Sequence, residues 1–297
     1  RLRSRGLGDV YKRQGKYIYR NSTTGDITIS GITFKTENIG KEYKYILREL
    51  QPTDNGKVDG TPIEGAKKNN DGNWVYKGIT FDKEAKEIII KVNSPDGTNE
   101  IQAQVTGNNF EFVNSYDAST TLALNGTKKI TGREFKSGDT FTFEITGENG
   151  APLPKDDKGQ EMSSVTIHPE SGKEAALDFG TITFTQADMK GAVAEKNQDG
   201  STKQYTKDFT YTLTETGTDG NGMTYDKAPK RVTITVTDDN HGTMKAAVKE
   251  GSAELEWTNK YTATGAVGEA DLAVTKVLNG RAMKAGEFNF TIKSDEG

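Results

Sequence analysis

The chain has 297 residues, of which 32% are hydrophobic, and it carries a net charge of −4. This acidic balance excludes the basic surface that binding to nucleic acid or to an anionic membrane requires. No apolar run approaches the roughly 20 residues of a membrane-spanning helix. Glycine is abundant (33 residues) and cysteine is absent, so the composition favours many short strands and turns without disulfides.

The first 14 residues, RLRSRGLGDVYKRQ, are basic and lack the apolar stretch of a signal peptide. They resemble translated sequencing-adapter sequence. Residues 1–14 are therefore expected to be non-native read-through, and the fold prediction begins at residue 15.

Residues 15–117 form the first of three related segments. Three of its blocks recur later in the chain: GDITISGITF (25–34) resembles ALDFGTITF (176–184), YKYILRE (43–49) resembles FTYTLTE (209–215), and FEFVNSY (110–116) resembles LEWTNKY (255–261). Such self-similarity indicates repeated domains. The first segment lacks the Lys-x-[Ile/Leu]-x-Gly-Arg strand that opens the later two, so it is predicted to be a partial domain with its opening strand missing.

Residues 118–264 are predicted to be a complete domain. The segment opens with TKKITGREF (127–135), passes through alternating runs such as FTFEI and RVTITVTD, and closes at LEWTNKY. Alternation between turn residues is typical of half-buried strands, and one short helix is expected at 187–196. Several short strands in about 145 residues favour an all-β, Ig-like β-sandwich.

Residues 265–297 are predicted to start a further repeat. The block TKVLNGRAMKAGEFNFTI (275–292) resembles TKKITGREFKSGDTFTFEI (127–145) and ends in a strand pattern. The small residues of 262–270 are typical of a linker. We therefore expect tandem β-sandwich domains in a piece of a longer protein.

Three polar side chains of the middle segment fall on apolar strand faces. Alternate side chains of a strand share a face, so each can be assigned by parity. The three are Lys128, Glu215 and Asn259, and apolar residues of matching parity are Leu124, Leu213 and Trp257 respectively. The next lysine, Lys129, has the opposite parity and is predicted to point outward. The pattern recurs with Glu49 and Asn114 in the first segment and with Lys276 in the third.

Two interpretations of this trio remain open. Because unpaired buried charges are very unfavourable, one is a buried ion pair of Lys128 and Glu215 beside the Asn259 amide. The other is covalent. Burial lowers the pKa of a lysine, a neutral amine is a nucleophile, and a protonated glutamate can donate to the carboxamide oxygen and shuttle protons. Attack of Lys128 Nζ on Asn259 Cγ then expels ammonia, with fixed proximity in place of an external catalyst.

The motifs Lys-x-[Ile/Leu]-x-Gly-Arg, Tyr-x-Leu-x-Glu and Phe/Trp-x-Asn-x-Tyr occur in this order. Together they resemble the isopeptide-linkage domains of Gram-positive pilins and cell-wall-anchored adhesins. The resemblance implies an intramolecular bond between Lys128 and Asn259 that Glu215 assists. The equivalents in the partial repeats are the assisting Glu49 and the unpaired Asn114 and Lys276.

The same resemblance implies a structural stalk repeat, extracellular and anchored to a Gram-positive cell wall. Its expected partners are adjacent repeats of the same chain, with other pilin subunits or a host surface ligand as further candidates. The alternative function is an adhesive module that binds host glycan or matrix protein through loops. Trp74, next to the polar stretch 51–73 that forms an extra loop or hairpin, is the candidate for such recognition.

No enzyme activity is expected beyond autocatalytic bond formation. A glycosidase needs two convergent carboxylates, whereas only one inward carboxylate recurs in each repeat. No cofactor or metal is expected either, since His168 and His241 lie in separate polar segments without the spacing of a metal site. The acidic run at 156–161 lacks the spacing of a calcium loop and reads as a solvated turn.

Overall fold

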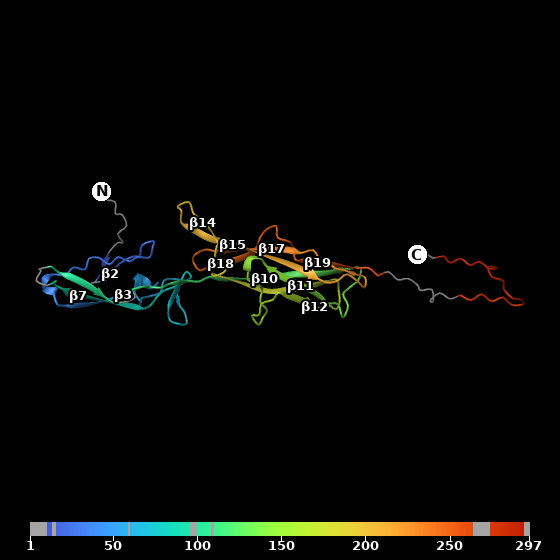
Figure 1. The fold of residues 1–297 in the computed structure, drawn as a ribbon, viewed down its shortest axis with the longest axis horizontal. Helices are drawn as coiled ribbons and strands as arrows, with labels where there is room; N and C mark the ends of the chain where they lie inside the picture. The colour runs from blue at the N-terminus through green and yellow to red at the C-terminus, as the bar shows by residue number, and fades with distance from the viewer. Residues whose placement is uncertain are drawn as a thin grey trace. The chain divides into compact units, whose positions relative to one another are not determined.

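The computed structural model describes residues 11–13, 16–58, 60–95, 100–107, 110–263 and 274–293. Within these residues the secondary structure is almost entirely β (Figure 1). The helices among them are single 3₁₀ turns: η1 (Thr36–Asn38), η2 (Asp54–Gly56) and η3 (Glu148–Gly150). No described helix has the length and apolar character needed to cross a membrane.

The strands follow one another with short connections. The first nine are β1 (Tyr11–Arg13), β2 (Lys16–Ile18), β3 (Glu42–Arg48), β4 (Lys67–Lys68), β5 (Trp74–Tyr76), β6 (Ile79–Thr80), β7 (Ala85–Asn93), β8 (Gln102–Thr106) and β9 (Ser115–Tyr116). The next ten are β10 (Ser119–Thr131), β11 (Phe141–Gly147), β12 (Ser164–Ile167), β13 (Glu174–Thr185), β14 (Val193–Lys196), β15 (Thr202–Thr216), β16 (Met223–Thr224), β17 (Lys230–Asp238), β18 (Met244–Val248) and β19 (Glu256–Tyr261).

The chain divides into two compact units, each built from several stretches of sequence. The first comprises Arg1–Thr121, Phe184–Lys207 and Thr235–Ala247. The second comprises Leu122–Thr183, Asp208–Ile234 and Val248–Gly297.

The first unit contains two small antiparallel sheets. One has the order β3-β7-β8 and the other the order β4-β5-β6-β9. The extra polar stretch of this region leads into the hairpin of β4 and β5. A further pair, β1 and β2, is also antiparallel.

One repeated block of the first segment is not a strand. Residues 25–34 resemble the sequence of β13, yet they form no strand. The strand that pairs with β13 is β10, and the described residues before 118 contain no counterpart of β10. A strand is held by its neighbour's backbone hydrogen bonds, so the same local sequence has a different outcome in the two repeats.

The middle segment forms two sheets with a common core. One sheet has the order β13-β10-β19-β16, and the other has the order β12-β11-β15-β17-β18, with β14 paired to β15 (Figure 1). In the second unit, Trp257 of β19 packs 5.0 Å from Phe143 of β11 and 6.0 Å from Phe179 of β13, measured between ring centroids. Because these rings come from both sheets, the sheets pack face to face. The predicted all-β sandwich is confirmed.

Alternating burial shows which face of each strand lines this core. In β10, the side chains of Leu124, Lys128 and Ile130 are all buried. In β15, Phe209, Tyr211 and Leu213 alternate with more exposed residues in the same way. The parity rule therefore assigned the inward face of both strands correctly.

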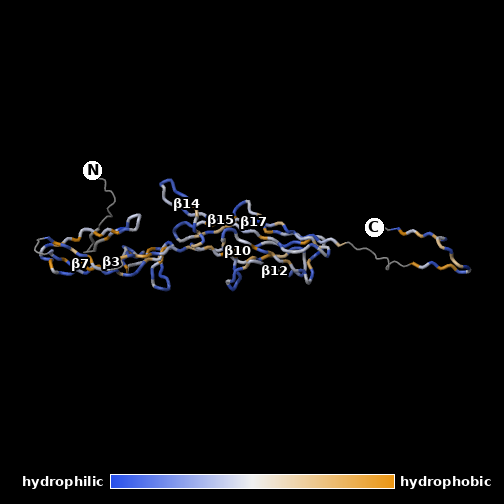
Figure 2. Tube along the Cα trace, viewed as in Figure 1, coloured by the Kyte–Doolittle hydropathy of each residue, from blue (hydrophilic) through white to orange (hydrophobic). Residues whose placement is uncertain are grey.

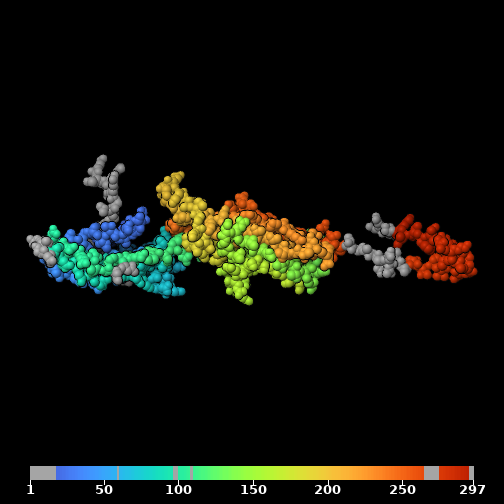
Figure 3. Space-filling view, in the orientation of Figure 1, coloured from blue at the N-terminus to red at the C-terminus, as the bar shows by residue number. Residues whose placement is uncertain are grey.

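The helix expected at 187–196 is wrong. The Asp188 carboxylate accepts hydrogen bonds from the backbone N–H and the hydroxyl of Thr185, both at 2.7 Å. Such local bonds compete with a helix. Gly191 then takes a positive φ of 81°, and the chain enters β14. The hairpin of β14 stands out from the surface as a lobe (Figure 3).

The described residues of the third segment, 274–293, contain no strand. Most of its apolar side chains are exposed, with Val274 82% and Ile292 81% accessible; Figure 2 shows orange segments along this part of the tube. The strand pattern near 286–292 therefore has no sheet to join among the described residues. Alternation alone does not form a strand without a partner.

Candidate functional site

Lys128 and Asn259 lie on neighbouring strands of one sheet. β10 and β19 pair in parallel, with Lys128 opposite Trp257 and Ile130 opposite Asn259. Lys128 and Asn259 are thus diagonal neighbours on the same, inward face. Glu215 comes from β15 of the facing sheet. The structure therefore brings the three predicted residues together from the first, a middle and the last strand of the segment, and their exposed fractions are only 0%, 0% and 1% for Lys128, Asn259 and Glu215.

The Glu215 carboxyl group bridges the other two side chains. Its Oε2 lies 2.8 Å from Lys128 Nζ, and its Oε1 accepts a hydrogen bond of 2.8 Å from Asn259 Nδ2. Lys128 Nζ also lies 3.5 Å from the Trp257 carbonyl oxygen and 5.0 Å from the ring centroid of Phe141. The amine, the carboxyl group and the carboxamide thus form one connected, fully buried cluster.

Burial shifts both ionisable groups of this cluster toward their neutral forms. It lowers the pKa of the Lys128 ammonium, against the opposing attraction of the Glu215 carboxylate. It raises the pKa of the Glu215 carboxyl group, against the opposing effect of Lys128. A neutral amine beside a protonated carboxyl group is the combination that nucleophilic attack on an amide requires.

The carboxamide oxygen of Asn259 faces a residue that the sequence did not single out. Its Oδ1 accepts a hydrogen bond of 2.8 Å from the backbone N–H of Asp226. The expected contact between Glu215 and this oxygen is therefore wrong: Glu215 contacts the amide nitrogen, and the oxygen is bound by the Asp226 N–H instead. The signal that could have found Asp226 is the repeat of GITFDK (78–83) as GMTYDK (222–227).

The first segment holds a similar pair without a lysine. Asn114 Nδ2 donates to Glu49 Oε1 at 2.6 Å, and the backbone N–H of Asp82 donates to Asn114 Oδ1 at 2.8 Å. Glu49 is half-buried and Asn114 exposed. No lysine of the described residues forms an ion pair with Glu49.

Lys276 of the third segment is exposed, and its Nζ donates to the Val277 carbonyl oxygen at 2.8 Å.

Comparison with known protein families assigns both segments that hold these pairs to one family. Residues 7–117 and 124–262 each match the family model FctA, described as the Spy0128-like isopeptide-containing domain. The chain belongs to the FctA family. It therefore carries tandem pilin-type, isopeptide-containing domains, of a family typical of the extracellular cell surface. No curated protein matches the chain.

Lys129, the lysine next to the trio, lies on the outward face of β10 in this FctA domain. Lys129 is 32% exposed by its side chain, and its Nζ lies 2.7 Å from Glu256 and 3.5 Å from Glu174. It points away from the core, as its parity predicts. One step along β10 thus separates a solvated lysine from the buried one.

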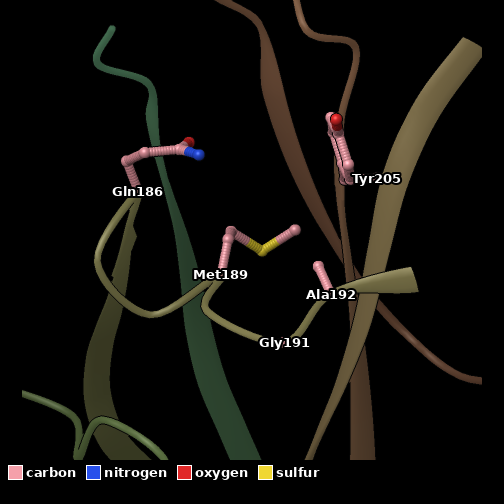
Figure 4. A pocket seen from close by; sticks show the side chains of 5 residues that line it. All are labelled: Gln186, Met189, Gly191, Ala192 and Tyr205. Carbon is pink, nitrogen blue, oxygen red and sulfur yellow. The ribbon is translucent and has the colours of Figure 1, made fainter. Parts of the chain in front are cut away.

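A surface hollow of the first unit offers no competing catalytic cluster. Figure 4 shows its lining side chains, which are Gln186, Met189, Gly191, Ala192 and Tyr205. This lining provides one amide and one phenol but no carboxylate, so it lacks the paired acids of a glycosidase.

Trp74, the candidate for surface recognition, lies in β5 with the ammonium of Lys68 5.2 Å from its ring centroid.

The histidines of these FctA domains make local contacts. His168 Nδ1 lies 3.1 Å from the Thr140 hydroxyl, and His241 Nδ1 lies 2.7 Å from the Asp239 carbonyl oxygen. Among the described residues, no group of three or more histidine, aspartate or glutamate side chains is arranged to hold a metal ion.

Proposed function

We propose that the middle FctA domain cross-links itself through an autocatalytic isopeptide bond between Lys128 and Asn259. The observation that carries this proposal is the buried bridge that Glu215 makes between the lysine amine and the asparagine amide, at 2.8 Å on each side. A permanent buried ion pair would leave the desolvation of both charges incompletely compensated. The covalent product removes the charge of Lys128 from the core.

The reaction balances without an external reagent. Lys128 Nζ attacks Asn259 Cγ, and the new C–N bond forms as the Cγ–Nδ2 bond breaks. Glu215 receives a proton from Nζ and supplies one to Nδ2, so the leaving group is ammonia and the carboxyl group is regenerated. Both proton transfers are between atoms that lie 2.8 Å apart, and the transfer to Nδ2 reverses the hydrogen bond that Nδ2 donates to Glu215 before the reaction. Proximity supplies the effective concentration of the amine.

The biological role we infer is a structural stalk segment of a bacterial cell-surface pilin or adhesin. The tandem family match and the β-sandwich fold support it. The reaction happens once in each molecule and consumes the residues that react, so we propose no enzymatic turnover for this chain. The partners that fit this role are adjacent repeats of the chain and other pilin subunits, outside the cell and anchored to a Gram-positive wall.

Intact-mass spectrometry of the folded full chain tests the bond. We expect the mass to be lower than the sequence mass by one ammonia, and a proteolytic digest to contain a peptide that joins the regions of Lys128 and Asn259. The variant Lys129→Ala is the matched control and should show the same loss. An unmodified mass in correctly folded protein would falsify the covalent reaction and leave the ion pair.

A further inference from the structure

A nine-residue block beside the trio occurs twice in the chain. It reads GITFDKEAK at 78–86 and GMTYDKAPK at 222–230. In both copies it runs from a two-residue strand (β6 or β16) into the next long strand (β7 or β17). We name this block the Asp corner, after Asp82 and Asp226.

In the middle domain, Asp226 makes four contacts, of which two reach the closing strand β19 and two stay within the Asp corner. Its backbone N–H donates to Asn259 Oδ1 at 2.8 Å. Its carboxylate accepts from the backbone N–H of Ala228 at 3.2 Å and from that of Thr258 at 3.4 Å. The same carboxylate lies 3.3 Å from Lys230 Nζ. The Asp226 carboxylate thus holds the backbone of Thr258, and the Asp226 backbone N–H holds the side-chain oxygen of Asn259.

The first segment repeats these contacts around Asp82. The backbone N–H of Asp82 donates to Asn114 Oδ1 at 2.8 Å. The Asp82 carboxylate accepts from the N–H of Glu84 at 2.8 Å and from that of Val113 at 3.3 Å, and it lies 3.7 Å from Lys86 Nζ. Each equivalent residue takes the equivalent role, although the two sequences differ at four of the nine positions.

The lysine of the corner makes a fifth repeated contact. Lys230 Nζ lies 6.0 Å from the ring centroid of Trp257, and Lys86 Nζ lies 5.5 Å from that of Phe112. Both rings belong to the residue two positions before the asparagine. Five contacts that recur at matched positions are not explained by turn geometry alone, because a turn has no need of the asparagine side chain.

We propose that the Asp corner positions and activates the asparagine for isopeptide formation. The backbone N–H of Asp226 polarises the carboxamide and stabilises the negative charge that develops on Oδ1 during attack by Lys128. The Asp226 carboxylate and Lys230 are positioning residues that hold this N–H and the closing strand in place. The inference rests on the cross-linking reaction proposed for this domain.

The arrangement of donors around the carboxamide supports this division of roles. Glu215 contacts the nitrogen that leaves and Asp226 contacts the oxygen that gains charge. A fixed backbone donor at a developing oxyanion is a strong contributor to acyl transfer, and the loss of one such donor slows known reactions by about 10²–10³-fold. Hydrogen bonds from Ala228 and Lys230 hold the pKa of Asp226 below its ordinary value despite burial, so its carboxylate stays ionised.

The test follows ammonia loss during refolding of the full chain. Chain that has never folded is purified from inclusion bodies in guanidinium, refolded by dilution, and sampled for intact mass. Folding is followed in parallel by Trp257 fluorescence in a Trp74→Phe background. We expect Asp226→Ala to fold but to lose ammonia about 10- to 100-fold more slowly than wild type, as a displaced donor predicts. The matched controls are Lys158→Ala and Asp157→Ala, which remove an exposed lysine and an exposed aspartate outside the corner and should leave the rate unchanged.

A pH profile separates positioning from a loss of stability. The reactive pair holds one proton, so its rate should fall on both the acid and the alkaline side. The charged and titratable groups that face Lys128 and Glu215 are Tyr225, Asp226 and Lys230. The negative charge of Asp226 raises the pKa of both partners, so Asp226→Asn should move the profile to lower pH.

The corner lysine should act in the opposite direction. The positive charge of Lys230 lowers the pKa of Lys128, so Lys230→Ala should move the profile to higher pH. Lys230→Arg keeps the charge and should restore the wild-type profile. These shifts follow from charge alone, so positioning is judged by the rate of ammonia loss at each variant's own optimum pH. A positioning role lowers that rate in folded protein, and a purely structural corner leaves it unchanged.

The outcomes distinguish the two proposals. A wild-type chain that never loses ammonia overturns the proposed cross-link itself. A wild-type chain that reacts while Asp226→Ala reacts at the same rate overturns only the role of the Asp corner. Should Asp226→Ala fail to fold, the rates of folded Asp226→Asn and Lys230→Ala at their own optimum pH decide: slower ammonia loss supports the role, and wild-type rates overturn it.

Discussion

The middle and first repeats hold the same glutamate–asparagine pair in different surroundings. In both, the asparagine nitrogen donates to the glutamate, at 2.8 Å for Asn259 and at 2.6 Å for Asn114. In both, an Asp corner binds the asparagine oxygen at 2.8 Å. The difference is burial: Asn259 is fully buried, whereas Asn114 is exposed.

This comparison separates the geometry of the site from its chemical activation. The Glu–Asn pair and the Asp corner assemble from the later strands of a repeat, with no contribution from a lysine strand. The nucleophile, and the burial that favours its neutral form, come with β10, which covers the pair in the middle repeat. The geometry around the asparagine is therefore present in the first segment without a buried lysine among the described residues.

Removing the nucleophile should have the largest effect, because it makes the middle repeat resemble the first. Lys128→Met leaves the core filled but prevents the bond between residues about 130 positions apart, which is worth about 5 kcal/mol of chain entropy. For a domain of this size we expect the melting temperature to fall by roughly 10–20 °C, measured by calorimetry. Asn259→Ala should lose the same bond, and an unchanged melting temperature in both variants would show that no bond exists in wild type.

Removing the proton shuttle should abolish the bond while the strands stay in place. Glu215→Ala leaves Lys128 and Asn259 on adjacent strands but deletes both hydrogen bonds along which protons move. We expect an unmodified mass together with a folded Trp257 environment, read by intact mass and by fluorescence in the Trp74→Phe background. Normal cross-linking in this variant would mean that another acid serves the reaction.

Limited proteolysis compares the two repeats directly in one molecule. The middle repeat combines a closed sandwich with the proposed bond, whereas the first has small sheets and an exposed pair. We expect cleavage to remove residues up to about 117 and those after about 264 before it cuts between them, as monitored by the masses of the resistant fragments; exposed and weakly packed backbone is the preferred site of cutting. Equal survival of both repeats would contradict the contrast in stability.

The smallest effect is expected from the neighbouring lysine. Lys129→Ala removes two surface ion pairs, with Glu174 and Glu256, and such pairs contribute up to about 1 kcal/mol. Cross-linking should remain complete and the melting temperature should change little. A loss of the bond in this variant would mean that Lys129, and not Lys128, is the reactive lysine.

Parity in the sequence was sufficient to find the trio, because each residue sits on a strand with a clear apolar face. It was insufficient where a strand depends on a distant partner: residues 25–34 and 286–292 alternate but have no sheet to join among the described residues. The helix expected at 187–196 failed because Asp188 binds the backbone locally. Asp226 was missed because it contacts Asn259 through its backbone N–H, and side-chain parity says nothing about backbone donors. The sequence did contain a signal, since the Asp corner occurs twice.

The parallel pairing of β10 with β19 has a mechanical consequence. The chain enters the middle repeat through β10 and leaves it through β19, so tension on the two ends would pull these strands along their length and load their ladder in shear. A bond between Lys128 and Asn259 carries that tension directly from the first strand to the last. The intervening stretch of about 130 residues, which could otherwise extend to roughly 430–470 Å, is then excluded from the load path. Single-molecule pulling should show this lengthening in Lys128→Met and none of it in wild type.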